Sequence, residues 1–100
     1  MTKADIINQI SEKTGIEKIT VTEVVENFFK NVKSNMIDGN ELFFRGFGSF
    51  ILQHRKAKIG RNITKNIAVK IDEHFVPKFK PSKEFVSAIK SSKKVAAKSK

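Results

Sequence analysis

The sequence predicts an α+β fold made of an N-terminal helical hairpin, a three-stranded antiparallel sheet with a long β-ribbon arm, and a short C-terminal helix. Apolar residues recur at helical spacing up to residue 37, and from residue 41 the pattern becomes that of strands. The chain has 100 residues, of which 39% are hydrophobic, which is enough for one domain with a small core. It contains no cysteine, which excludes disulfides and Cys-based zinc sites and is typical of a reducing compartment.

The first two helices are expected to pack as an antiparallel pair. The first begins at Thr2, whose hydroxyl can cap a free amide, and stops at Gly15. The second ends at the turn-forming Asp38-Gly39-Asn40. Its apolar residues follow the helical spacing i, i+3, i+4, i+7, i+8, i+11, i+15, which places them on one face. They are Val21, Val24, Val25, Phe28, Phe29, Val32 and Met36.

Two strands are expected to meet at Arg45-Gly46-Phe47-Gly48-Ser49-Phe50, because glycine within a β pattern usually marks a bend or tight turn. Residues 49–80 then resemble one long hairpin whose middle lacks core residues. A two-stranded ribbon is marginally stable by itself in water. We therefore expect an arm at about 53–75 that becomes ordered on a partner.

The C-terminal part is expected to contain one helix and a tail. Ser82 is predicted to cap the helix, with Glu84 in its first turn. Residues 91–100 are low in complexity and basic, so we expect a disordered, nonspecific polycationic tail beyond a domain at 1–90.

Nine phenylalanines are a heavy aromatic load for so short a chain. We expect the stripe of phenylalanines to be core rather than a surface for stacking on bases. Burying it needs a second copy, so we predict an obligate homodimer with a shared core.

The net charge of +10 is unevenly distributed. Residues 1–45 hold six basic and seven acidic side chains, whereas residues 46–100 hold fourteen basic and three acidic ones. A merely solvated surface would carry both signs, so this split indicates a part that folds and a part that meets a polyanion. No apolar run approaches the ~18 residues of a membrane span, and the N-terminus lacks a signal-peptide core. We expect a small, soluble, intracellular protein with no membrane partner.

Three spaced motifs resemble the bacterial HU / integration host factor family of histone-like DNA-binding proteins. They are Arg45-Gly46-Phe47-Gly48-Ser49-Phe50, Gly60-Arg61-Asn62 and Val76-Pro77-Lys78-Phe79-Lys80-Pro81, and the likeness covers residues 1 to about 90. In that family two chains intertwine, two β-ribbon arms wrap the minor groove, and an apolar residue at each arm tip kinks the duplex. The resemblance implies a cytoplasmic, nucleoid-associated protein that bends double-stranded DNA, including distorted or nicked DNA, with low sequence specificity. It implies a homodimer, or a heterodimer with a paralogue.

The resemblance also assigns roles to individual residues. Phe47, Phe50 and Phe79 match the aromatic core of the dimer, and Ile63 matches the intercalating wedge. The positions expected to contact DNA are Lys3, Arg45, His54, Arg55, Lys56, Lys58, Arg61, Asn62, Ile63, Thr64, Lys65, Lys70, Lys78, Lys80 and Lys83.

The arm tip departs from the family pattern, because Ile63 stands where the family usually has proline. Isoleucine can also act as an apolar wedge. It lacks the fixed φ of proline and adds an amide donor, so we expect a less rigid tip and a less sharp kink. The alternative is that Ile63 is an ordinary exposed aliphatic residue.

Three other functions compete with DNA bending as interpretations of the sequence. Arg45 and His54 resemble integration host factor more than HU, which favours a site-preferring DNA bender as the second interpretation. A basic RNA-binding protein is the rival from another class, but the chain lacks an aromatic β-face of the RRM type. An enzyme is not expected, since the chain has no cysteine, two unpaired histidines, no phosphate loop and no carboxylate pair at useful spacing. Asp72, Glu73 and His74 alternate faces in a strand and do not converge, so neither a metal site nor acid-base chemistry is expected there. No cofactor and no small-molecule substrate are expected either.

Overall fold

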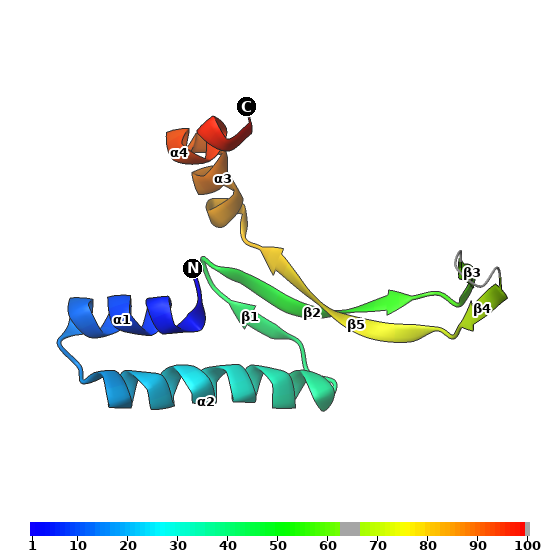
Figure 1. Ribbon diagram of the computed structural model, residues 1–100, viewed down its shortest axis with the longest axis horizontal. Helices are drawn as coiled ribbons and strands as arrows, with labels where there is room; N and C mark the ends of the chain where they lie inside the picture. Colours follow the sequence, from blue (N-terminus) through cyan, green and yellow to red (C-terminus); the bar gives the residue numbers. More distant parts are fainter. Residues whose placement is uncertain (63–66, 100) are drawn as a thin grey trace. The chain divides into compact units, whose positions relative to one another are not determined.

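The computed structural model describes residues 1–62 and 67–99. It consists of two compact units, a helical unit of residues 1–38 and a sheet unit of residues 39–100 (Figure 1). Helices precede and follow an antiparallel sheet, which confirms the predicted α+β class.

The helical unit is an antiparallel pair formed by α1 (Lys3–Thr14) and α2 (Lys18–Ile37), as the sequence predicts (Figure 1). The Asp5 carboxylate accepts the Thr2 amide at 2.9 Å, which completes a capping box at the start of α1. The helix ends at Gly15, whose φ of 75° is left-handed and suits a residue without a Cβ. Within the described residues, no helix is both long and apolar enough to cross a bilayer.

The apolar face of α2 is only partly covered by its own chain. Val21 and Met36 are buried, together with Ile7 on α1. By contrast, Val24 is 64% exposed and Phe29 is 48% exposed. A single chain therefore leaves much of the predicted core face in contact with water.

The sheet unit is built on three antiparallel strands in the order β1-β2-β5, which confirms the predicted three-stranded sheet. They are β1 (Leu42–Phe44), β2 (Gly48–Arg55) and β5 (His74–Pro81). Strands β2 and β5 pair along their whole length, from Gly48 opposite Pro81 to Arg55 opposite His74. A tight turn joins β1 to β2, with Gly46 in the left-handed region at φ 79°.

The arm is a second, two-stranded sheet made by β3 (Lys58–Asn62) and β4 (Ile67–Ile71). The single hairpin expected over residues 49–80 is therefore interrupted, because residues 56–57 and 72–73 belong to no strand. At the interruption His54 Nε2 lies 3.1 Å from a Glu73 carboxylate oxygen, and His74 Nδ1 lies 2.9 Å from the Asp72 carbonyl oxygen. Acidic residues are poor strand formers. Here the Glu73 carboxylate and the Asp72 backbone carbonyl contact histidine side chains between the two ladders.

Helical segments follow β5, and two short ones lie within residues 93–99, in the segment for which a tail is expected. Helix α3 (Lys83–Ser91) begins at Ser82, whose hydroxyl accepts the Phe85 amide at 3.1 Å, as the predicted cap requires. One further helical turn, α4 (Lys93–Ala96), is followed by the 3-10 turn η1 (Ala97–Ser99). Ser92 caps α4 through the Val95 amide at 3.3 Å, and alanine and lysine favour helix, so a low-complexity segment is helical here.

An aromatic cluster lies on one side of the sheet unit. Phe79 is its centre, with ring centroids 5.0 Å from Phe50 and 5.1 Å from Phe47, and Phe85 of α3 stacks on Phe47 at 5.7 Å. The backbone of Gly48 lies against this cluster. A Cβ added there would be 2.6 Å from the Lys80 carbonyl oxygen and 2.7 Å from the Phe79 ring.

We expect Gly48→Ala to lower the free energy of unfolding by about 1–3 kcal/mol, the usual cost of forcing an atom into a packed site. Gly60→Ala on the arm is the matched control, because its Cβ would meet Ile71 at an ordinary 3.7 Å. Denaturant unfolding of both variants at one fixed protein concentration measures the difference. Equal stability of the two variants would show that Gly48 has room for a side chain.

Candidate nucleic-acid interface

The pairing of β1, β2 and β5 sorts their side chains onto two faces. Successive residues of a strand point to opposite faces, and residues paired across strands share a face. One face, here called the basic face, consists of Phe43, Ser49, Ile51, Gln53, Arg55, His74, Val76, Lys78 and Lys80.

Charge is segregated between the two faces. All the lysines and arginines of the three strands, namely Arg55, Lys78 and Lys80, lie on the basic face, and these strands contain no acidic residue. The opposite face is aromatic, with Phe50 packed between Phe44 at 6.0 Å and Phe79 at 5.0 Å. The nearby Glu41, just before β1, has its carboxylate on the Leu52 amide at 2.9 Å. Three cations on strands that contain no acidic residue create a positive potential, so the basic face is suited to a polyanion.

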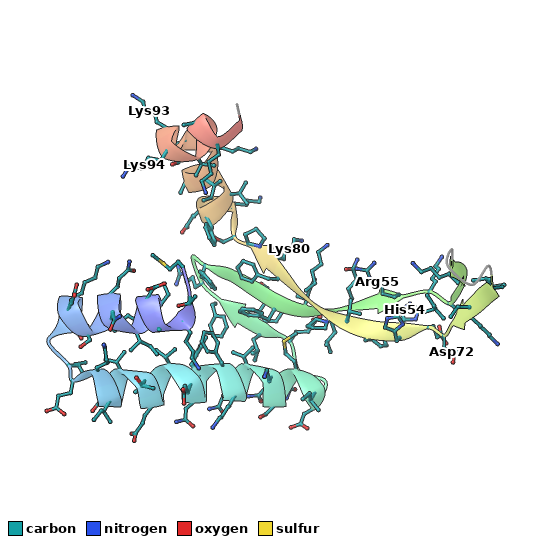
Figure 2. All side chains as sticks on the ribbon, in the orientation of Figure 1. His54, Arg55, Asp72, Lys80, Lys93 and Lys94 are labelled. Atoms are coloured by element: carbon teal, nitrogen blue, oxygen red, sulfur yellow. The ribbon has the colours of Figure 1, made fainter. Side chains whose placement is uncertain are left out.

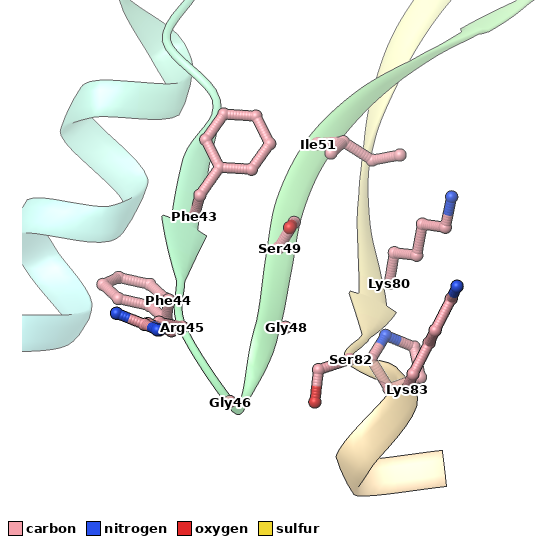
Figure 3. A pocket seen from close by; sticks show the side chains of 11 residues that line it. Phe43, Phe44, Arg45, Gly46, Gly48, Ser49, Ile51, Lys80, Ser82 and Lys83 are labelled. Carbon is pink, nitrogen blue, oxygen red and sulfur yellow. The ribbon is translucent and has the colours of Figure 1, made fainter.

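A hollow opens at the end of the sheet where the β1–β2 turn and the start of α3 meet (Figure 3). Its basic lining residues come from three elements: Arg45 from the turn, Lys80 from β5 and Lys83 from α3. In Figure 3 Lys80 and Lys83 extend on the same side of the sheet, whereas Arg45 lies across β1 from them. Residues separated by almost forty positions in the sequence thus contribute positive charge around one hollow.

The arm carries cations on both of its faces. Lys58 is paired with Ile71, and the next pair joins Ile59 to Lys70, so the two lysines point to opposite sides of the ribbon. Both are exposed. Of the other predicted arm residues, Lys56 is exposed between β2 and β3, and Arg61 and Asn62 belong to β3. Ile63, Thr64 and Lys65 lie outside the described residues.

Two predicted contact residues lie neither on the basic face, nor around the hollow, nor on the arm. Lys3 belongs to the helical unit, where its Nζ lies 3.2 Å from Glu26 in an exposed ion pair. His54 is on the aromatic face of the sheet, next to Arg55 in Figure 2, and it binds Glu73 and lies 5.1 Å from the Phe75 ring. Exposed ion pairs contribute little to stability, so neither is a strong structural anchor. Among the described residues, no three His, Asp or Glu side chains are arranged to hold a metal ion.

Sequence reasoning missed part of the basic face. Ser49, Gln53 and the exposed Phe43 belong to it through the register alone. The alternation Lys78-Phe79-Lys80 was a usable signal for β5. The run Leu42-Phe43-Phe44 contains no such signal, because all three residues are apolar.

A helical pair, a sheet with one cationic face and a cationic ribbon define a small basic protein of the polyanion-binding class. A family model described as bacterial DNA-binding protein matches residues 1–90. The chain is 36% identical over 89 residues to integration host factor subunit alpha of Anaeromyxobacter sp. (strain Fw109-5), covering 89% of this chain and 90% of that protein. It is 37% identical over 95 residues to integration host factor subunit beta of Marinobacter nauticus, covering 94% and 97%. The chain therefore belongs to the bacterial DNA-binding protein family of HU and integration host factor, as the motifs predicted.

Solved structures agree with this assignment. HU of Anabaena, in a cocrystal structure with DNA, superposes with a TM-score of 0.86 at 27% identity, covering 92% of this chain and all of that chain. A mutant of HU from Thermotoga maritima superposes with a TM-score of 0.67 at 22% identity, covering 89% and 99%, which shows the shared fold. Residues 91–100, with α4 and η1, lie beyond the family match.

Proposed function

We propose that this protein is an architectural, nucleoid-associated protein that binds double-stranded DNA and bends it with low sequence specificity. The observation that carries the proposal is the basic face, on which Arg55, Lys78 and Lys80 gather without an acidic neighbour in the three strands. Duplex DNA presents a dense line of phosphates, and neutralising them releases counterions, which drives binding. Family membership supports DNA, rather than RNA, as the polyanion.

The distribution of charge on the arm supports its insertion into a groove. A ribbon lying flat on a backbone would need cations on one face only. Lys58 and Lys70 instead point to opposite sides, which suits a ribbon with a phosphate strand on either side of it. The minor groove has such walls, and widening it to admit a ribbon bends the duplex.

Low sequence specificity follows from the kind of contacts available. Lysine contacts to phosphates fix position and carry no direct sequence information. The site-preferring alternative was motivated by Arg45 and His54. Because His54 lies on the aromatic face and binds Glu73, only Arg45, which lines the hollow, supports that alternative.

The incomplete core supports a dimer. Val24 and Phe29 on α2 are 64% and 48% exposed in the single chain, and a second copy of the same face would cover them. We propose a homodimer. The relatives include both subunits of integration host factor, so a heterodimer with a paralogue is the alternative.

The C-terminal lysines are proposed to add a nonspecific contact with DNA. Lys93 and Lys94 begin α4 and extend outward from it in Figure 2, and Lys98 follows in η1. Cations near a duplex strengthen binding through counterion release whatever their exact geometry.

Ile63→Ala is expected to reduce DNA bending more than it reduces affinity, because a shorter side chain no longer separates base pairs while the phosphate contacts remain. Energy transfer between dyes at the two ends of a short duplex measures the bend, and titration of the same duplex measures the affinity. Ile59→Ala is the matched control, since Ile59 is an arm isoleucine that is 77% exposed. Bending that is unchanged in Ile63→Ala would exclude Ile63 as the wedge.

Phe29→Gln is expected to shift the protein from dimers towards monomers, because it replaces part of the apolar surface that a second copy would cover. Sedimentation over a range of concentrations measures the shift. The melting temperature of the unaltered protein should also rise with concentration, since association stabilises only the folded chain. A concentration-independent, fully monomeric protein would contradict the dimer.

A further inference from the structure

Phe43 is an exposed aromatic residue in the middle of a cationic surface. It is 72% exposed, although it belongs to a strand whose two neighbouring residues are half-buried. The register places it on the basic face opposite Ser49, which is itself paired with Lys80. Transfer of a phenyl ring out of water has a favourable free energy, which an exposed Phe43 does not gain. We therefore expect a partner that covers the ring.

The sheet itself does not cover this ring. The aromatic cluster packs on the other face, where Phe44 lies 6.0 Å from Phe50. The residue directly across from Phe43 is Ser49, which is too small to shield it. Half-buried Ile51 lines the same hollow, so Phe43 and Ile51 provide the hollow with an apolar floor on the basic face (Figure 3).

The charges around Phe43 indicate the chemical class of the partner that covers it. The hollow that it lines also contains Arg45, Lys80 and Lys83, and none of its lining residues is acidic. A second copy of this face would bring like charges together, which opposes self-association here. An occupant must therefore combine negative charge with apolar surface. The minor groove of duplex DNA does so, because phosphates run along its edges and deoxyribose rings form its walls.

We propose that Phe43 packs against deoxyribose at the edge of the minor groove when a duplex lies on the basic face, with Lys80 and Lys83 on the flanking phosphates. This inference rests on the proposed DNA binding and adds an apolar contact to it. Phe43 lies in a strand within the sheet and not at an arm tip, so it acts as a positioning contact and does not enter the base stack. Because sugar is common to all sequences, the contact adds affinity without sequence preference.

The contact has a distinctive dependence on salt. A lysine that leaves a phosphate reduces the number of released counterions, which lowers the slope of log K against log salt. A phenyl ring on a sugar releases no counterions, so its loss weakens binding equally at every salt concentration. Salt titration thus separates the two kinds of contact on one surface.

The test compares full-length variants in binding to one labelled DNA duplex over a series of salt concentrations. Phe43→Gln should weaken binding about tenfold at each concentration, with the slope of the unaltered protein. Phe43→Leu should retain most of the affinity because it keeps apolar surface. Lys80→Gln should lower the slope by about one. Ile37→Gln is the matched control and should bind normally, since Ile37 is 84% exposed but lies at the end of α2 beside Asp38.

The outcomes separate this inference from the proposed function. Normal affinity in Phe43→Gln, with weakened binding in Lys80→Gln, would overturn the inference and leave DNA binding intact. A reduced salt slope in Phe43→Gln would also overturn it. So would a loss of affinity that is absent at protein concentrations where sedimentation shows the variant to be fully dimeric. Failure of the unaltered protein to bind the duplex would overturn the proposed function itself.

Discussion

The antiparallel pairing of β2 with β5 is the constraint on which the other features of the sheet unit depend. Eight residue pairs hold the two strands in one register, from Gly48 opposite Pro81 to Arg55 opposite His74. A slip of one residue would move every side chain of a strand to the other face. Lys78 and Lys80 would then face the aromatic cluster, and Phe79 would face water. Close packing of Phe79 and the Lys80 carbonyl against Gly48 opposes such a slip.

This register links stability to function. The aromatic face supplies the packing of the sheet unit, and the same alternation necessarily presents Arg55, Lys78 and Lys80 together on the other face. The binding surface is therefore as rigid as the pairing that creates it. The arm is different, because its two strands form a separate sheet beyond a break and have cations on both sides. A rigid cationic platform and a narrow cationic ribbon suit a duplex that rests on one and is enclosed by the other.

Much of the fold could be predicted where the signal was local. The spacing of the α2 residues, the Ser82 cap and the alternation at residues 78–80 each reflect a period or a hydrogen bond within a few positions. The break between the β2–β5 pairing and the arm could not be predicted, because the contact beside it joins His54 to Glu73, which are nineteen positions apart. The exposure of Phe43 depends on the pairing of β1 with β2. It could not be predicted from the sequence, because both neighbours of Phe43 are apolar as well. Helix α4 was not predicted, because low complexity is typical of disorder and the cap at Ser92 was not used as a signal.

The central claim, that duplex DNA lies on the basic face, is tested most directly by crosslinking from single positions. The chain has no cysteine, so Ser49→Cys on the basic face and Ser34→Cys on exposed α2 each accept one photoreactive label. We expect the label at residue 49 to crosslink to bound duplex DNA and the label at residue 34 to remain unattached. Crosslinks from residue 34 but not from residue 49, in complexes that bind with normal affinity, would place the DNA on another surface.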